Sequence, residues 1–234
     1  MRILTLASVR GSPGVTTAAV LLGAAIEGAV VVEGDLDGGV LAVRYGLGRE
    51  PGLITFAAAA AETGEDWRPH AQEAGGVAVM VGPDAPAASA ALWRTAGERI
   101  TRRLLAADGV AVVDAGRVRM PRPIVTASDV LGLVVRPVAE QLVALTHLLP
   151  VLRPTVRGVL GIVLAGDGPY RAADIERTME VPIIGSLPED RPVAEALCHG
   201  GAPAGRLRRS RLARGALALA RAVHGDRTLE ELGS

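Results

Sequence analysis

The sequence predicts an α/β fold, with a doubly wound, mostly parallel sheet of about seven strands and helices on both faces. Short runs rich in Val and Ile alternate with longer helical stretches. The runs are apolar on successive residues, as in strands that are covered on both faces. Gly and Pro mark the joints between segments, for example at Gly82-Pro83 and Gly168-Pro169. Strand–helix alternation of this kind favours parallel pairing through right-handed crossovers.

The individual elements follow from these patterns in chain order. The expected strands are residues 3–7, 29–33, 77–81, 110–114, 130–135, 159–164 and 182–185. The expected helices are residues 16–27, 39–46, 52–62, 87–106, 138–151, 170–179 and 207–223. Because no linker, repeat or low-complexity tract interrupts the pattern, we expect one domain over residues 1–234. Residues 200–205 are expected to form a flexible joint before a basic C-terminal helix.

Composition narrows the class of protein. The 234 residues carry no formal net charge, so a nucleic-acid or membrane contact would need a local patch. Cys198 is the only cysteine, which excludes an internal disulfide and a thiolate metal cluster. The longest apolar stretch, residues 130–152, is interrupted by Arg136, Glu140 and His147, and predicts no membrane span. We therefore expect a cytoplasmic location.

A glycine-rich loop follows the first expected strand, within "ASVRGSPGVTTAAV". Loops of this kind bind phosphate because successive backbone N–H groups converge on anionic oxygens at a helix N-terminus. Gly11, Gly14 and the threonines Thr16 and Thr17 suit that role, but Val15 stands where the G-x-x-x-x-G-K-[ST] pattern has lysine. The chain contains no lysine at all. The alternative is a Gly-rich turn with Thr caps on an ordinary helix.

Two carboxylates follow expected strands at the sheet edge where ligands bind in such folds. Asp35 comes after residues 29–33, in "EGDLDGG", and Asp114 ends residues 110–114. Asp35 and Asp37 could bind magnesium themselves. A solvated acidic turn is the alternative for Asp35, and a helix cap is the alternative for Asp114.

These segments together resemble the ParA/MinD family of P-loop ATPases, whose deviant Walker motif is K-G-G-x-G-K-T-T. Arg10 falls at the first lysine, which in the family reaches the partner subunit's nucleotide, while Ser12 replaces a glycine and Val15 replaces the P-loop lysine. "VVEGDLDGG" resembles the second motif, "VAVVDAG" the Walker B strand, and "DVLGLVVRPVAEQLVAL" and "VPIIGSLPED" the later segments. Ala165 stands where the family often has an asparagine that contacts adenine.

The resemblance implies a site for ATP or ADP with magnesium. It places the positioning of the attacking water on Asp35 and magnesium on Thr16 and Asp114. The residues implied for nucleotide contact are Arg10, Gly11, Ser12, Gly14, Val15, Thr16 and Thr17. Because Val15 donates nothing to a phosphate, we expect a pseudo-ATPase that positions or assembles a partner. The alternative is an active ATPase that cycles between a monomer and a nucleotide-sandwich dimer, with Arg10 and magnesium compensating.

The family's activities imply partners as well as a cofactor. A homodimer is implied, together with a protein partner in chromosome or plasmid partitioning, division-site placement, or the pilus machinery served by CpaE/TadZ-type proteins. The basic C-terminal stretch "GRLRRSRLARGALALARAV" offers Arg206, Arg208, Arg209 and Arg211 for a nonspecific DNA contact. The alternative is a packing helix whose apolar stripe is Leu212, Ala216, Leu219 and Val223. A membrane contact is less favoured, because the helix lacks bulky aromatic residues.

Overall fold

The sheet is the centre of the molecule. We describe a computed structural model, and it covers residues 1–10, 14–59, 66–202 and 209–224. Within these residues, eight strands form one sheet in the order β3-β4-β2-β5-β1-β6-β7-β8. Their bounds are β1 Arg2–Ser8, β2 Ala29–Glu33, β3 Gln72–Ala74, β4 Val77–Met80, β5 Val110–Arg117, β6 Val130–Val135, β7 Val159–Ala165 and β8 Ile183–Leu187. The predicted doubly wound α/β class is confirmed.

Every strand pair is parallel except β3 with β4, which is antiparallel. The sequence predicts about seven strands, and β3 is the additional one. This strand has three residues, Gln72, Glu73 and Ala74, and it occupies the sheet edge, where only one side needs a partner. A short polar edge strand carries no apolar run, so the signal that identified the other strands is absent here.

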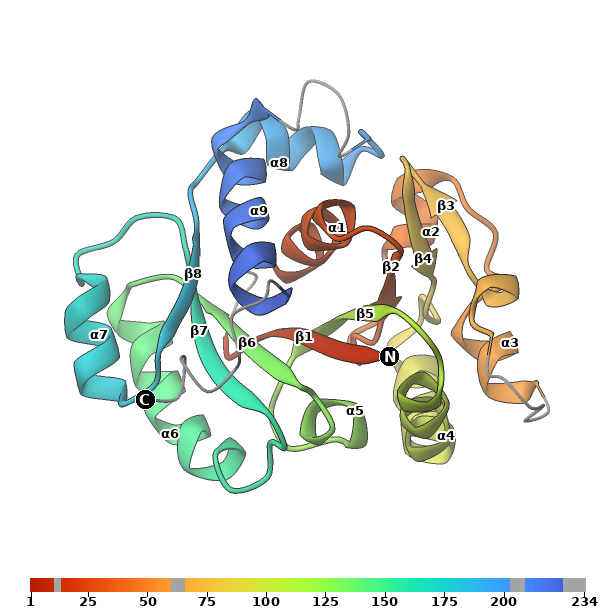
Figure 1. Ribbon diagram of the computed structural model, residues 1–234, viewed down its shortest axis with the longest axis horizontal. Helices are drawn as coiled ribbons and strands as arrows, with labels where there is room; N and C mark the ends of the chain where they lie inside the picture. The colour runs from red at the N-terminus through yellow and green to blue at the C-terminus, as the bar shows by residue number, and fades with distance from the viewer. Residues whose placement is uncertain (11–13, 60–65, 203–208, 225–234) are drawn as a thin grey trace.

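Helices cover both faces of the sheet (Figure 1). In the described residues these are α1 Val15–Ala25, α2 Leu41–Tyr45, α3 Leu53–Ala58, α4 Pro86–Ala106, α5 Pro123–Thr126, α6 Ala139–Leu152, α7 Ala172–Met179, α8 Arg191–Cys198 and α9 Arg211–His224, with the 3₁₀ turn η1 Arg68–His70. The seven expected helices are all present, with shifted ends. The short helices α5 and α8 were missed; each begins with proline at a first-turn position, which resembles a loop in sequence.

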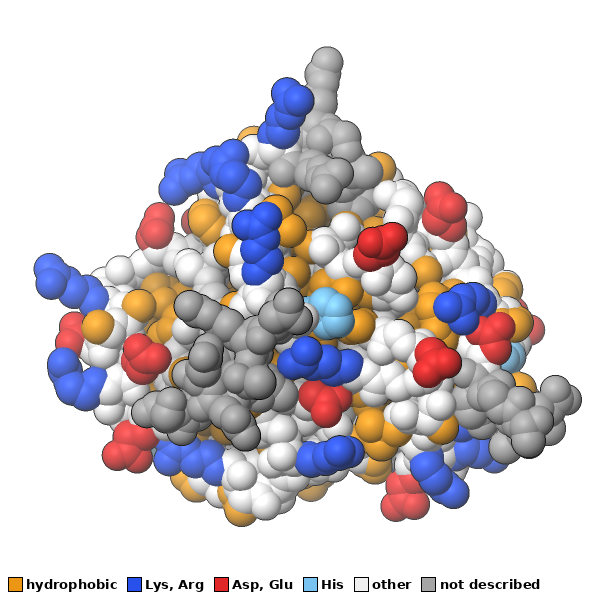
Figure 2. All heavy atoms as spheres, in the orientation of Figure 1, with side chains coloured by type: hydrophobic (Ala, Val, Ile, Leu, Met, Phe, Trp, Pro, Cys, Tyr) orange, Lys and Arg blue, Asp and Glu red, His pale blue; other side chains and the backbone are white. Residues whose placement is uncertain are grey.

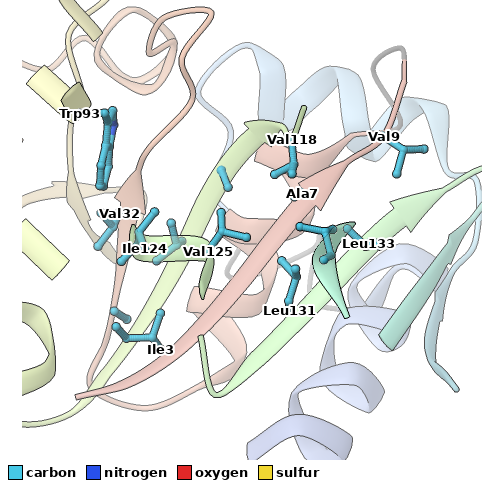
Figure 3. Packing of buried hydrophobic residues seen from close by; sticks show 14 of the residues in the cluster. Ile3, Ala7, Val9, Val32, Trp93, Val118, Ile124, Val125, Leu131 and Leu133 are labelled. Carbon is cyan, nitrogen blue, oxygen red and sulfur yellow. The ribbon is translucent and has the colours of Figure 1, made fainter. Parts of the chain in front are cut away.

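The buried hydrophobic residues that the structure describes form two clusters, one on each face of the sheet. One unites β-strand side chains with residues of α3, α4, α5, α6 and α7, including Phe56, Trp93 and Ile124. Figure 3 shows Trp93 near Val32 and Ile124 within this cluster. The other unites the opposite strand side chains with α1, α2, α8 and α9. Since the strands β2 and β6 are buried along their whole length, their continuous apolar runs match a sheet covered on both faces.

Helix α9 packs onto the sheet through the apolar stripe predicted from its sequence. Leu212, Ala216, Leu219 and Val223 are all buried in the cluster shared with α1 and β8. The packing interpretation is confirmed for this stripe. The helix begins at Arg211 rather than at residue 207, and residues 203–208, which include most of the expected joint at 200–205, lie outside the described part. None of the described helices is long and apolar enough to cross a membrane.

Candidate functional site

The carboxyl ends of three neighbouring strands bring the predicted site residues together. β1 lies between β5 and β6, and β5 lies between β1 and β2. The register pairs Leu6 of β1 with Asp114 of β5, and Asp114 with Glu33 of β2. The chain then leaves β1 towards α1 and leaves β2 towards Asp35. Segments far apart in sequence therefore meet at one edge, where parallel sheets bind ligands.

Helix α1 begins at the end of the glycine-rich loop. Gly14 precedes the helix with a φ of 88°, a left-handed conformation that favours glycine, and its carbonyl accepts the Ala18 N–H at 2.9 Å. The first N–H groups of a helix have no acceptor within it and form a site for anions. Gly11, Ser12 and Pro13 lie outside the described residues, so the middle of the predicted phosphate loop is not part of this description.

Val15, the residue that replaces the P-loop lysine, is buried. It is 7% exposed and belongs to the hydrophobic cluster that contains Leu4 and Leu6. Thr16 and Thr17 are half-buried and, like Val15, line a cavity at the helix start. The first position of α1 therefore contributes packing rather than a charge.

Asp114 is the most deeply buried of the predicted site residues. It is 1% exposed, and its carboxylate accepts hydrogen bonds from the Thr16 hydroxyl and from the Gly116 N–H, the latter at 3.0 Å. Burial raises the pKa of Asp114 to about 6, and these two hydrogen bonds only partly oppose that rise. The negative charges of Asp35 and Glu33 raise it further. The pair expected to hold magnesium, Thr16 and Asp114, is thus in direct contact.

Asp35 lies at the turn that follows β2. Its Oδ1 accepts the Asp37 N–H at 2.9 Å, and its carbonyl accepts the Ser89 hydroxyl at 2.6 Å. The carboxylate rests against Gly116, which has a φ of +57° and at which any side chain would collide with Asp35. Burial raises the pKa of Asp35, whereas the Asp37 N–H opposes the rise. Asp35 is therefore held in a fixed place beside the Asp114-Ala115-Gly116 segment.

Glu33 has a structural role at the same edge. It is 2% exposed; its Oε1 accepts the N–H groups of Val40 at 2.5 Å and Leu41 at 2.8 Å, and its Oε2 accepts the Gly82 N–H at 3.0 Å. Burial raises its pKa, and the three N–H donors oppose the rise. The carboxylate binds the start of α2 and the turn after β4.

Arg122 is a residue of the site that the sequence analysis missed. Its guanidinium donates to the carbonyl of Gly34 at 2.9 Å and to that of Ala115 at 2.8 Å, so it ties the end of β2 to the end of β5. Its Cζ lies 5.7 Å from the ring centroid of Trp93. Desolvation lowers the pKa of Arg122, and the charges of Asp35 and Asp114 oppose that fall. No spacing in the sequence indicates these contacts, since Gly34 is 88 residues away.

A cavity of about 730 Å³, named here the strand-end cavity, lies over these groups. The residues that line it include Thr16, Thr17, Asp35 and Asp114, together with Ala165, Gly166 and residues 187–191. Its cationic lining residues are Arg44, Arg117, Arg136 and Arg191. Arg10 is exposed and is not among the residues that line it.

The residues of the site fit the magnesium ion and a phosphate group of the implied ATP or ADP, but one expected positive charge is missing. Hydroxyl and carboxylate oxygens, as on Thr16 and Asp114, are the ligands that Mg²⁺ takes alongside substrate phosphates. The helix N-terminus at Gly14 and Val15 suits a phosphate group. The lysine that would neutralise this phosphate is absent, and Val15, which stands in its place, is buried in the hydrophobic cluster. The site therefore has groups that can bind magnesium and phosphate, but it lacks the positive charge of the P-loop lysine.

The residues proposed for DNA contact are only partly described. Arg206 and Arg208 lie outside the described residues, whereas Arg209 and Arg211 are exposed at the start of α9. Figure 2 shows basic side chains over the region that α9 occupies. Arg214, on the same helix, donates to the carbonyl of Arg209 at 2.6 Å.

Comparison with known proteins gives a fold and no close relative. No family model and no curated protein matches the sequence. Among solved structures, a ParA family ATPase from Chlorobium tepidum is similar with a TM-score of 0.75 and 18% identity, over 96% of this chain and 98% of that one. The cell division ATPase MinD from Pyrococcus furiosus is similar with a TM-score of 0.71 and 21% identity, over 95% of this chain and 98% of that one. MinD from Pyrococcus horikoshii, in a complex with Mg-ADP, is similar with a TM-score of 0.67 and 18% identity, over 95% of this chain and 96% of that one. The chain therefore has the fold of ParA/MinD ATPases, as the sequence resemblance implied.

Proposed function

We propose that this chain is a ParA/MinD-like positioning protein that binds ATP or ADP with magnesium in the strand-end cavity and hydrolyses ATP little or not at all. The observation that carries the proposal is the burial of Val15 in the hydrophobic cluster, at the first position of α1. Because Val15 is an apolar side chain packed in this cluster, its position contributes no charge to phosphoryl transfer.

Retained binding is supported by groups that do not depend on lysine. The start of α1 offers backbone N–H groups, and Thr16 and Asp114 offer oxygen ligands for the cation. Arg44, Arg117 and Arg136 line the cavity, and none of the three forms an ion pair within the described residues. The Mg-ADP complex of the similar MinD from Pyrococcus horikoshii supports the choice of ligand.

Weak hydrolysis follows from the missing charge. A unit charge about 4 Å from a phosphate oxygen contributes roughly 4 kcal/mol at an effective dielectric of about 20. The charge on the transferring group is redistributed in the transition state, so that contribution matters more for turnover than for binding. Arginine presents a planar fork rather than a compact ammonium, so the lining arginines are imperfect substitutes.

The second candidate is a working ATPase, and the retained carboxylates favour it. Asp35 is fixed against Gly116, and Asp114 contacts Thr16, although burying both raises their pKa values. In this case Arg10, which is exposed, would reach the nucleotide of a second subunit. Light scattering separates the two candidates: the pseudo-ATPase gives either a dimer without nucleotide or a monomer that ATP does not dimerise, whereas the working ATPase dimerises when ATP is added.

The process served is chromosome or plasmid partitioning, division-site placement or localisation of pilus machinery, through a protein partner. Similarity to a ParA family ATPase and to the cell division ATPase MinD supports the partitioning and division-site parts of this range. Arg206, Arg208, Arg209 and Arg211 are the residues for a nonspecific DNA contact, and salt-sensitive DNA retention that is lost on changing all four to Ala would support it. A neighbouring gene for a centromere-binding protein or a pilus ATPase would select among the processes.

A calorimetric titration with ATP and magnesium tests nucleotide binding. We expect saturable heat from the wild-type chain and at least tenfold weaker binding by Thr16→Val, because that change removes the hydroxyl that contacts Asp114. Thr146→Val, on the exposed side of α6, is the matched control and should bind like the wild type. Absence of binding at millimolar ATP, or equal binding by Thr16→Val, would contradict the proposal.

A further inference from the structure

A second cavity lies beside the strand-end cavity and is used by neither candidate function. It measures about 630 Å³ and lies between α4 and residues 117–123, and we name it the α4 cavity. Pockets of about 300 to 1,000 Å³ are the usual size for small organic ligands. It shares only Asp37 and Arg117 with the strand-end cavity.

The α4 cavity combines apolar walls with an excess of positive charge. Leu36, Trp93, Met120, Pro121 and Pro123 supply apolar surface, and Met120 is 66% exposed. Four arginines line the cavity, Arg94, Arg117, Arg119 and Arg122, against two carboxylates, Asp37 and Glu98. Such a lining suits a ligand with an apolar body and an anionic group.

The arginines at the rim are available for such a ligand. Within the described residues, Arg94, Arg117 and Arg119 form no ion pair, and all three are exposed. Only Arg122 is engaged, by the carbonyls of Gly34 and Ala115. An unpaired guanidinium beside apolar walls binds carboxylate strongly, because the fork donates two parallel hydrogen bonds.

Trp93 gives a second, independent observation. It is 5% exposed, and its indole Nε1 is buried without a hydrogen-bond partner in the described part of the chain. Buried indole N–H groups usually have an acceptor. The other tryptophan follows that rule, since Trp67 donates to the Asp108 carbonyl at 3.2 Å. Trp93 also lines the α4 cavity, so a ligand bound there lies beside this side chain.

We propose that the α4 cavity is a binding site for a small amphiphilic anion, an aromatic or alkyl carboxylate whose apolar body lies against Trp93 and Met120 while its carboxylate binds Arg94 and Arg119. Arg122 connects this site to the nucleotide-binding edge, because it stacks near Trp93 and holds the ends of β2 and β5. The proposal does not depend on nucleotide binding.

The test follows the two indole N–H signals of the nucleotide-free chain by NMR. Naphthalene-2-carboxylate is the probe, and naphthalene-2-carboxamide is its neutral match; Trp67→Phe assigns the two signals. We expect saturable movement of the Trp93 signal with the acid, little movement of the Trp67 signal, and binding roughly tenfold weaker for the amide.

Matched variants locate the anion contact. Arg94→Gln with Arg119→Gln should weaken binding of the acid roughly tenfold or more, since two charge-assisted contacts are lost. Arg99→Gln with Arg102→Gln removes the same charge from exposed positions of α4 outside the cavity, and should change the affinity by no more than about twofold. The proposal is overturned if the Trp93 signal does not respond at millimolar acid, if the amide binds equally, or if both double variants bind alike.

Discussion

The two walls of the strand-end cavity differ in the charged side chains that they contain. On the α1 wall, the position of the P-loop lysine is filled by Val15, which is buried in a hydrophobic cluster. On the wall formed by the ends of β2 and β5, Glu33 and Asp114 are buried and Asp35 is half-buried, and burial raises the pKa of each. The α1 wall thus has an apolar, packed side chain at the position of the lysine. The wall formed by β2 and β5 has carboxylates whose charged forms are destabilised by desolvation.

The buried carboxylates are stabilised by neighbouring groups other than a lysine. Glu33 is satisfied by three backbone N–H groups, and Asp114 by Thr16 and Gly116. The charge of Arg122 interacts with both Asp35 and Asp114, and its guanidinium is itself anchored by two carbonyls. Arg122 thus supports the carboxylate wall through the carbonyls of Gly34 and Ala115, in addition to the contact of Thr16 with Asp114.

Loss of Arg122 should have the largest effect. Arg122→Ala leaves the carbonyls of Gly34 and Ala115 without donors and Asp35 without its cation, so we expect the free energy of unfolding to fall by about 3 kcal/mol. Urea denaturation measures the change. Arg119→Ala, exposed in the same segment, is the control and should stay within about 0.5 kcal/mol of wild type. Equal effects of the two changes would show that Arg122 does not support this wall.

Removing the buried charge of Asp114 should stabilise the nucleotide-free protein. The folded pKa of about 6 exceeds the ordinary 3.8, so the folded state holds the proton more tightly and the free energy of unfolding falls as pH rises through this window. Asp114→Asn should therefore be more stable than wild type at pH 8 by about 2 kcal/mol, with a gain that shrinks as the pH falls from about 6 to about 4.

Denaturation curves at several pH values, recorded with EDTA, measure this difference. Asp37→Asn, exposed on the neighbouring turn, is the control and should show no comparable gain. A gain for Asp114→Asn that does not vary with pH would mean that the Asp114 charge is not the cause.

Restoring a cation on the other wall should strengthen binding. In Val15→Lys the aliphatic stem can remain against the cluster while the ammonium extends towards the cavity, so we expect ATP with magnesium to bind at least tenfold more tightly, or about 1.4 kcal/mol. Calorimetry measures the affinity. Val15→Met adds length without charge and should not reproduce the gain; if it does, packing rather than charge distinguishes the two walls.

Much of the fold was predictable because strands covered on both faces must be apolar throughout. The runs at 29–33 and 130–135 coincide with β2 and β6 residue for residue. The edge strand β3 has no such requirement and was missed. The sequence also placed Asp35 just after β2, where the structure has it, whereas β5 was expected to end at Asp114 and instead continues to Arg117. The contacts of Arg122 with Gly34 and Trp93 arise only when distant segments meet, so one sequence carries no signal for them.

Steady-state phosphate release from ATP with magnesium will show whether the cavity, which keeps its carboxylates, lacks the charge for phosphoryl transfer. We expect wild-type turnover near background, with no further loss in Asp35→Ala. Rapid wild-type turnover that Asp35→Ala abolishes would contradict the pseudo-ATPase and establish the working enzyme in its place.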